Sequence, residues 1–86
     1  MIKLENLLGK GINTEISSSS PTEVRVNSQL NEAAMAKLQK YNIKIKKEND
    51  YYLLSPSDGP SREIIVDYLA RNKYKLKEKY RAFRQN

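Results

Sequence analysis

Cysteine, histidine and tryptophan are all absent from the 86 residues of this chain. Without cysteine, the chain has no disulfides, no thiolate metal ligands and no cysteine nucleophile. Without histidine, it lacks the commonest general base and the commonest metal ligand. These absences weigh against catalysis, so we predict a protein that is not an enzyme and that holds no metal or other cofactor. The lack of cysteine also favours a reducing compartment, and we expect a cytoplasmic protein.

Long apolar runs are missing as well. No stretch approaches the roughly 20 apolar residues that a membrane span requires. The segment 1–10 lacks the apolar run and the small-residue cleavage site of a signal peptide. A chain of this length corresponds to about one domain, so we expect a single domain over 1–86.

Positive charge is in excess. Sixteen Lys and Arg stand against ten Asp and Glu, which gives a formal net charge of +6. Such an excess favours nucleic acid, an anionic membrane surface or an acidic protein as the partner. A basic amphipathic helix suits a membrane surface, but this chain has no Trp and few large apolar residues at its basic end. We therefore expect no membrane partner.

The first third of the chain contains signals for three short elements. Leu4, Leu7 and Leu8 fit one face of a short helical turn that the following glycines end, although the same region also fits a short strand. Residues 12–16 and 22–27 alternate apolar with polar side chains, as half-buried strands do. We predict that they pair as a hairpin across a flexible Ser-rich loop at 17–22.

A helix is predicted over 28–41, with Asn27 or Ser28 as its N-cap. Its apolar stripe consists of Leu30, Ala34, Leu38 and Tyr41. A second hairpin follows, because Ile43–Lys46 alternates, Glu48–Asp50 has turn chemistry and Tyr51–Leu54 returns. A two-residue and a three-residue loop both fit this turn, which leaves the register open.

A second, longer helix is predicted over about 61–83. Asp58, Gly59 or Ser61 caps its start, and Pro60 suits its first turn. A helix of this length spans about 35 Å, which exceeds the width of so small a domain.

The predicted fold class is therefore α+β. It consists of a small antiparallel sheet of short strands in ββαββα order, with the two helices on one face. The predicted core consists mainly of Leu30, Ala34, Leu38, Ile43, Ile45, Leu53, Ile65 and Leu69.

Residues 71–86 form the predicted basic helical extension. Its cations are Arg71, Lys73, Lys75, Lys77, Lys79, Arg81 and Arg84. A helix with so many cations and a single Glu suits the phosphates of a nucleic-acid backbone. Lys44 and Lys46 of the second hairpin are candidate auxiliaries to this site. We predict an accessory or regulatory protein that binds DNA or RNA.

Other interpretations of the same residues stay open. The lysines of the extension also suit a merely solvated helix face, and Lys44 and Lys46 suit a solvated sheet face or a protected edge strand. The apolar stripe Leu76, Tyr80 and Phe83 suits an interface, either in a homodimer or with an acidic protein. In that case, the chain is an interaction module, such as an inhibitor or adaptor from a phage or mobile element.

Overall fold

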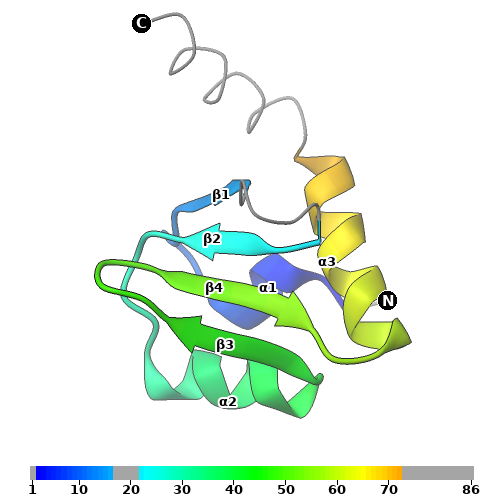
Figure 1. Cartoon of the computed structure of the whole chain (residues 1–86), viewed down its shortest axis with the longest axis horizontal. Helices are drawn as coiled ribbons and strands as arrows, with labels where there is room; N and C mark the ends of the chain where they lie inside the picture. The colour runs from blue at the N-terminus through cyan, green and yellow to red at the C-terminus, as the bar shows by residue number, and fades with distance from the viewer. Residues whose placement is uncertain (1, 17–21, 73–86) are drawn as a thin grey trace, which may run out of the picture.

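A computed structural model describes residues 2–16 and 22–72, which form a four-stranded antiparallel sheet and three helices (Figure 1). In chain order, the elements are α1 (Leu4–Leu8), β1 (Thr14–Ile16), β2 (Val24–Val26), α2 (Glu32–Lys40), β3 (Ile43–Lys47), β4 (Tyr52–Pro56) and α3 (Gly59–Arg71). The strand order across the sheet is β1-β2-β4-β3. The predicted α+β class is confirmed, as are the two hairpins, β1–β2 and β3–β4.

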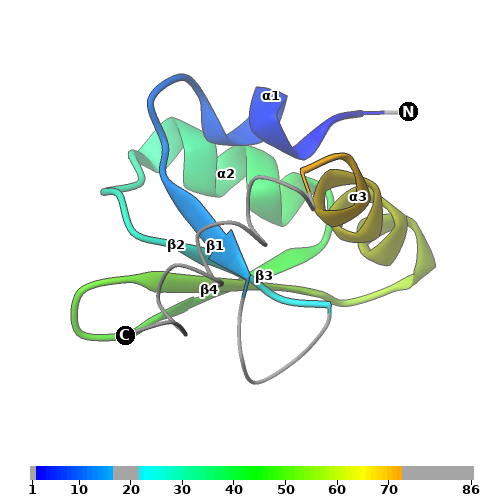
Figure 2. The same cartoon turned by 90° about the horizontal axis from the view of Figure 1, so that it is seen from above.

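All three helices lie on one face of the sheet, as Figure 2 shows. The strands alternate accordingly, because successive side chains of a strand point to opposite faces. Val24 and Val26 of β2 are fully buried, whereas Arg25 between them is partly exposed. The other face of the sheet is not covered by any helix that the structure describes.

The buried side chains of the described residues form one cluster between the sheet and the helices. Its fully buried apolar members are Leu4, Val24, Val26, Leu30, Leu38, Ile43, Leu54 and Ile65. Of the predicted core residues, five are buried, namely Leu30, Ala34, Leu38, Ile43 and Ile65. Ile45 and Leu69 are partly buried and pack against the cluster.

Leu53 is the wrong core prediction, because Leu54 occupies the place expected for it. β3 and β4 pair with Ile45 opposite Leu54 and Lys46 opposite Leu53. Leu53 therefore shares the outer face with Lys46, while Leu54 is fully buried. The register follows from the turn, where the Glu48 N–H donates to the Tyr51 carbonyl at 2.8 Å. This bond favours the two-residue loop of the two that the sequence allowed.

α2 begins later than predicted. Its N-cap is Asn31, whose side-chain oxygen accepts from the Ala34 N–H at 2.7 Å. The predicted caps have partners in the first hairpin instead. The Ser28 hydroxyl accepts from the Asn13 N–H at 2.9 Å, and the Asn27 N–H donates to the Asn13 carbonyl at the same distance. Residues 27 and 28 therefore extend the hairpin and cannot start the helix.

α3 begins two residues earlier than predicted, after Asp58. The Asp58 carboxylate accepts from the Ser61 N–H at 2.9 Å, while the Ser61 hydroxyl accepts from the Asp58 N–H at 3.0 Å. This reciprocal pair is a capping box, and Pro60 lies in the first turn as expected. The described helix ends at Arg71, and the predicted continuation over 73–83 lies outside the described residues.

α1 confirms the predicted N-terminal helical turn. Leu4, Leu7 and Leu8 are all buried, and the helix contacts both α2 and α3. Gly9 ends it with φ 96°, a conformation that favours glycine because a Cβ would be strained there. The three buried leucines of α1 thus complete the layer of helices on one face of the sheet.

Candidate interaction surfaces

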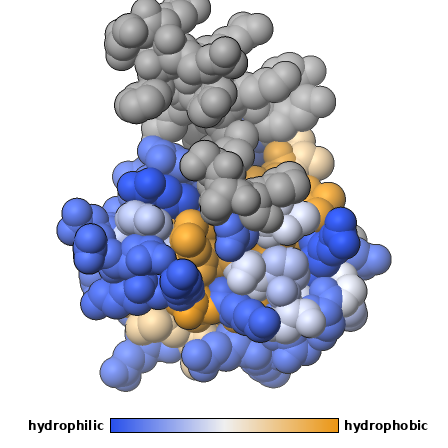
Figure 3. Space-filling model, viewed as in Figure 1, coloured by the Kyte–Doolittle hydropathy of each residue, from blue (hydrophilic) through white to orange (hydrophobic). Residues whose placement is uncertain are grey.

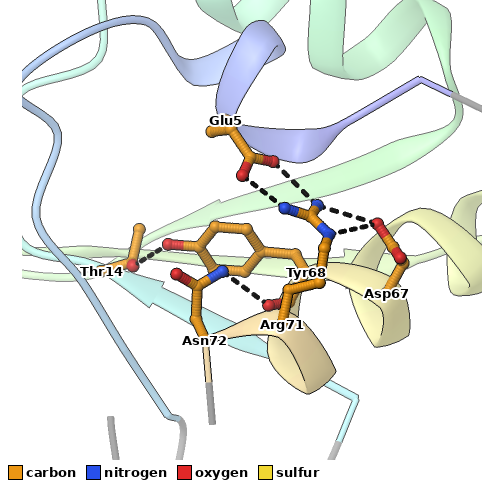
Figure 4. Close-up of polar contacts among 6 residues, drawn as sticks. All are labelled: Glu5, Thr14, Asp67, Tyr68, Arg71 and Asn72. Carbon is orange, nitrogen blue, oxygen red and sulfur yellow. Dashed lines mark hydrogen bonds and ion pairs between the residues drawn. The ribbon is translucent and has the colours of Figure 1, made fainter. Parts of the chain in front are cut away.

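Arg71 is the one predicted phosphate contact of the C-terminal extension that the structure describes. Its guanidinium makes two parallel bonds to the Glu5 carboxylate, at 2.7 and 2.9 Å (Figure 4). The same guanidinium binds the Asp67 carboxylate, one helical turn back, at 2.8 and 2.9 Å. Because two carboxylates hold it, Arg71 joins α3 to α1 and is not a free cation.

The charges of this cluster stabilise one another. The hydrogen bonds from Arg71 lower the pKa of Glu5 from its ordinary value to about 2. The hydrogen bonds to Glu5 and then to Asp67 raise the pKa of Arg71. Bidentate pairs of guanidinium and carboxylate also fix orientation. The cluster therefore links α1 to the end of α3.

One further bond joins the end of α3 to the first strand, and two more close the last turn of α3 (Figure 4). The hydroxyls of Thr14 in β1 and Tyr68 in α3 share a hydrogen bond. The Tyr68 carbonyl accepts from both the backbone and the side-chain N–H groups of Asn72, at 3.1 and 2.8 Å. The last described residue of the chain is thus bound to the last turn of α3.

The remaining residues of the predicted C-terminal site lie outside the described residues. These are the cations Lys73, Lys75, Lys77, Lys79, Arg81 and Arg84 and the apolar stripe Leu76, Tyr80 and Phe83. Their assignment to nucleic-acid contact or to an interface stays a prediction.

The open face of the sheet is mainly hydrophilic, with a narrow apolar strip across its middle (Figure 3). Strand pairing places Arg25, Leu53 and Lys46 side by side on β2, β4 and β3. The Arg25 guanidinium lies 3.9 Å from the centre of the Tyr51 ring, and its Nε donates to the Asn27 side chain at 2.8 Å. Glu15 on β1 lies opposite Arg25, with 4.0 Å between their charged atoms.

The two predicted auxiliary lysines both lie on this open face, on β3. Lys44 is exposed opposite Ser55, and Lys46 is exposed opposite Leu53. The ammonium of Lys46 lies 3.3 Å from the Glu48 carboxylate. The structure therefore brings the two auxiliaries together on one face.

Two grooves border the β3–β4 hairpin. The larger one, of about 560 Å³, is lined by Gln39, Asn42, Ile43, Lys44, Ile45, Lys46, Ser55 and Ser57. The smaller one, of about 250 Å³, lies at the turn and is lined by Asn27, Ser28, Gln29, Lys47, Asn49, Asp50, Tyr51 and Tyr52. Both are shallow and open to solvent, so they suit contact with a macromolecule better than enclosure of a small substrate.

Within residues 2–16 and 22–72, no three acidic side chains gather in a way that would hold a metal ion. None of the helices described is sufficiently long and apolar to cross a bilayer. The chain matches no family model, no curated protein and no solved structure in the comparisons that were made.

Sequence reasoning missed the Arg25–Tyr51 contact and the partner of Arg71. A helical spacing of four indicates the Asp67–Arg71 pair, but Glu5 lies 66 residues away from Arg71. Likewise, Arg25 and Tyr51 meet only because β2 pairs with β4. Local periodicity contains no signal for either contact.

Proposed function

We propose that this chain is a small non-enzymatic nucleic-acid-binding protein of an accessory or regulatory kind. The cations that contact the phosphate backbone are Lys73, Lys75, Lys77, Lys79, Arg81 and Arg84. Arg71, although predicted with them, is left out because Glu5 and Asp67 hold its guanidinium. Lys44 and Lys46 extend the cationic surface from the open face of the sheet.

The observation that supports this proposal best is the separation of charge along the chain. Residues 73–86 carry six Lys and Arg against one Glu, whereas residues 1–72 carry ten against nine. Almost the whole net charge therefore belongs to one short segment. Dense positive charge of this kind releases counterions from a nucleic-acid backbone, which is the main source of sequence-independent affinity.

The first prediction concerns binding to labelled duplex DNA, single-stranded DNA and RNA, measured by fluorescence anisotropy. If six cations neutralise phosphates, the affinity for the preferred ligand should fall by roughly a thousandfold between about 50 and about 200 mM salt. The ranking of the three ligands then identifies the substrate class. Absence of binding to all three at the lower salt would overturn the proposal and point to an acidic protein as the partner.

A charge-matched pair of variants locates the site. Replacing Lys75, Lys77 and Lys79 by Glu should weaken binding by at least about tenfold and flatten its salt dependence.

The control replaces three exposed lysines of the described part by Glu, namely Lys3, Lys10 and Lys40. It changes the net charge by the same amount at other places. Equal losses in the two variants would show that only the overall charge matters and would contradict the assignment to 73–86.

A further inference from the structure

β3 ends the sheet, and its outer edge pairs with no strand within the described residues. The bonds at its two ends show which backbone groups point to that edge. The Glu48 N–H donates to the Tyr51 carbonyl at 2.8 Å, and the Asn42 carbonyl accepts from the Ser57 N–H at 3.1 Å. Even-numbered residues from 42 to 48 therefore direct their backbone groups toward β4.

The odd-numbered residues of β3 direct their backbone N–H and C=O groups away from β4, because these groups point to alternate sides along a strand. Ile43, Ile45 and Lys47 thus present their N–H and C=O groups to the outer edge. A row of this kind is a template for one more strand. We propose that the β3 edge docks an extended acidic segment of a partner protein as a fifth strand of the sheet.

Charge selects an acidic occupant. Lys44 and Lys46 lie on one face of β3, and Lys47 follows at its end. The last turn of α2, which packs against β3, adds Lys37 and Lys40. All five lysines are exposed. Opposite charges that face each other on neighbouring strands stabilise the pairing, so Asp or Glu belongs beside Lys44 and Lys46.

The larger groove also favours apolar side chains in the docked segment. Its lining includes both faces of β3, with Ile43 and Ile45 on one and the two lysines on the other. Ile45 is only partly buried, so an added strand would cover more of it. The expected segment therefore alternates acidic residues, on the open face of the sheet, with apolar residues on the helix side.

A second copy of the chain is a poor occupant. Antiparallel pairing of two β3 strands about Ile45 would place Lys44 of one copy opposite Lys46 of the other, and like charges in that position are destabilising. A nucleic acid is also a poor match for the edge. Its phosphates accept from N–H groups but cannot donate to the row of carbonyls. Lys44 and Lys46 are shared with the proposed nucleic-acid contact, but the backbone edge of β3 is not part of that contact.

The test uses a fluorescein-labelled nine-residue peptide that alternates Val and Glu, titrated with the full chain at about 50 mM salt. Antiparallel pairing places the valines opposite Ile43 and Ile45, so their N–H groups bond to β3. N-methylation of the valines should therefore weaken binding by about tenfold or more, as the loss of even one or two hydrogen bonds implies. N-methylation of the glutamates should leave it nearly unchanged, because those groups face away.

Two variants at one position give a matched check on the protein side. Ile45→Pro removes an N–H that points away from β4, so the ladder to β4 stays intact. Ile45→Ala shortens the side chain but keeps that N–H. Proline should weaken peptide binding by about tenfold more than alanine does. If the proline variant does not fold, the two N-methylated peptides still decide the question.

Three results would overturn the proposal. The first is equal affinity for the two N-methylated peptides, which would show that charge alone drives binding. The second is failure of the unmodified peptide to bind at all. The third is equal weakening of peptide binding by Ile45→Pro and Ile45→Ala in folded variants, which would show that the Ile45 N–H makes no bond to the peptide.

Discussion

At the scale of single residues, Arg71 is a cation at the start of a basic segment that forms ion pairs within the fold. Two carboxylates hold its guanidinium and join α3 to α1, although the run of Lys and Arg that follows makes it look like one more surface cation in the sequence. Its side chain is 33% exposed and that of Glu5 is 41% exposed, so solvent screens the pair. The contribution of the pair to stability is therefore small.

Glu5 gives a prediction about pH. Its folded pKa of about 2 lies below the ordinary value of 4.5, so its contribution is present above about pH 4.5 and is lost as the pH falls toward 2. Glu5→Gln should lower the melting temperature slightly at pH 7 and should lose less than the native chain on going from pH 7 to pH 3. Circular dichroism melts at several pH values measure this difference.

Lys3→Gln is the control for this pH experiment, because it removes a charge beside Glu5 without breaking the bond to Arg71. It should keep the acid-induced loss of the native chain. Parallel pH curves for the native chain and the Glu5 variant would contradict a stabilising role for this ion pair.

At the scale of elements, the pairing of β4 with β2 decides the architecture, because it joins the two hairpins into one sheet. The chain reads Tyr-Tyr-Leu-Leu from 51 to 54, where β4 begins, so composition alone does not say which two face the core. The turn at Asn49 and Asp50 sets the register, and the register buries Tyr52 and Leu54. A slip of one residue would exchange the two faces.

Neighbouring leucines of β4 test this register. Leu54→Ala should lower the free energy of unfolding by about 2–5 kcal/mol, because it empties a fully buried site. Leu53→Ala removes the same atoms from the open face and should cost about 1 kcal/mol or less. Urea unfolding followed by circular dichroism compares the two, and similar losses would contradict the register.

At the scale of the whole molecule, the buried core and the excess of positive charge belong to different parts of the chain. The buried cluster of the described residues is built from side chains between Leu4 and Tyr68. The excess of positive charge belongs to 73–86. This division suggests that folding and the proposed contact with nucleic acid depend on different parts of the protein.

Removal of residues 73–86 tests that division. A chain that ends at Asn72 keeps the whole described cluster and the bonds of Asn72 to Tyr68. It should melt within a few degrees of the full chain and lose most of its affinity for nucleic acid at about 50 mM salt. Circular dichroism and anisotropy measure the two properties. A truncated chain that unfolds, or that binds as tightly as the full one, would contradict the division.

A large part of the fold follows from local patterns. The leucines of α1, the stripe of α2, the alternation of β3 and the capping signals before α3 each predict their element. The predicted boundaries fail where a distant partner intervenes, as with Ser28, whose hydroxyl bonds to the backbone of Asn13. The candidate site was predictable mainly as charge: Lys44 and Lys46 are visible in the sequence and allow an edge strand as one interpretation, but only the strand order places β3 at the edge.

The sequence by itself determined the types of the elements, their order and the concentration of cations at the basic end, because these depend on residues a few positions apart. The tertiary structure alone decided the pairing of β2 with β4, the outer position of β3 and the bond between Arg71 and Glu5. The physical reason is the separation in sequence between the residues that interact. Periodicity and capping act within a few residues, whereas these contacts join segments about 30 to 66 residues apart and form only when a common core brings the segments together.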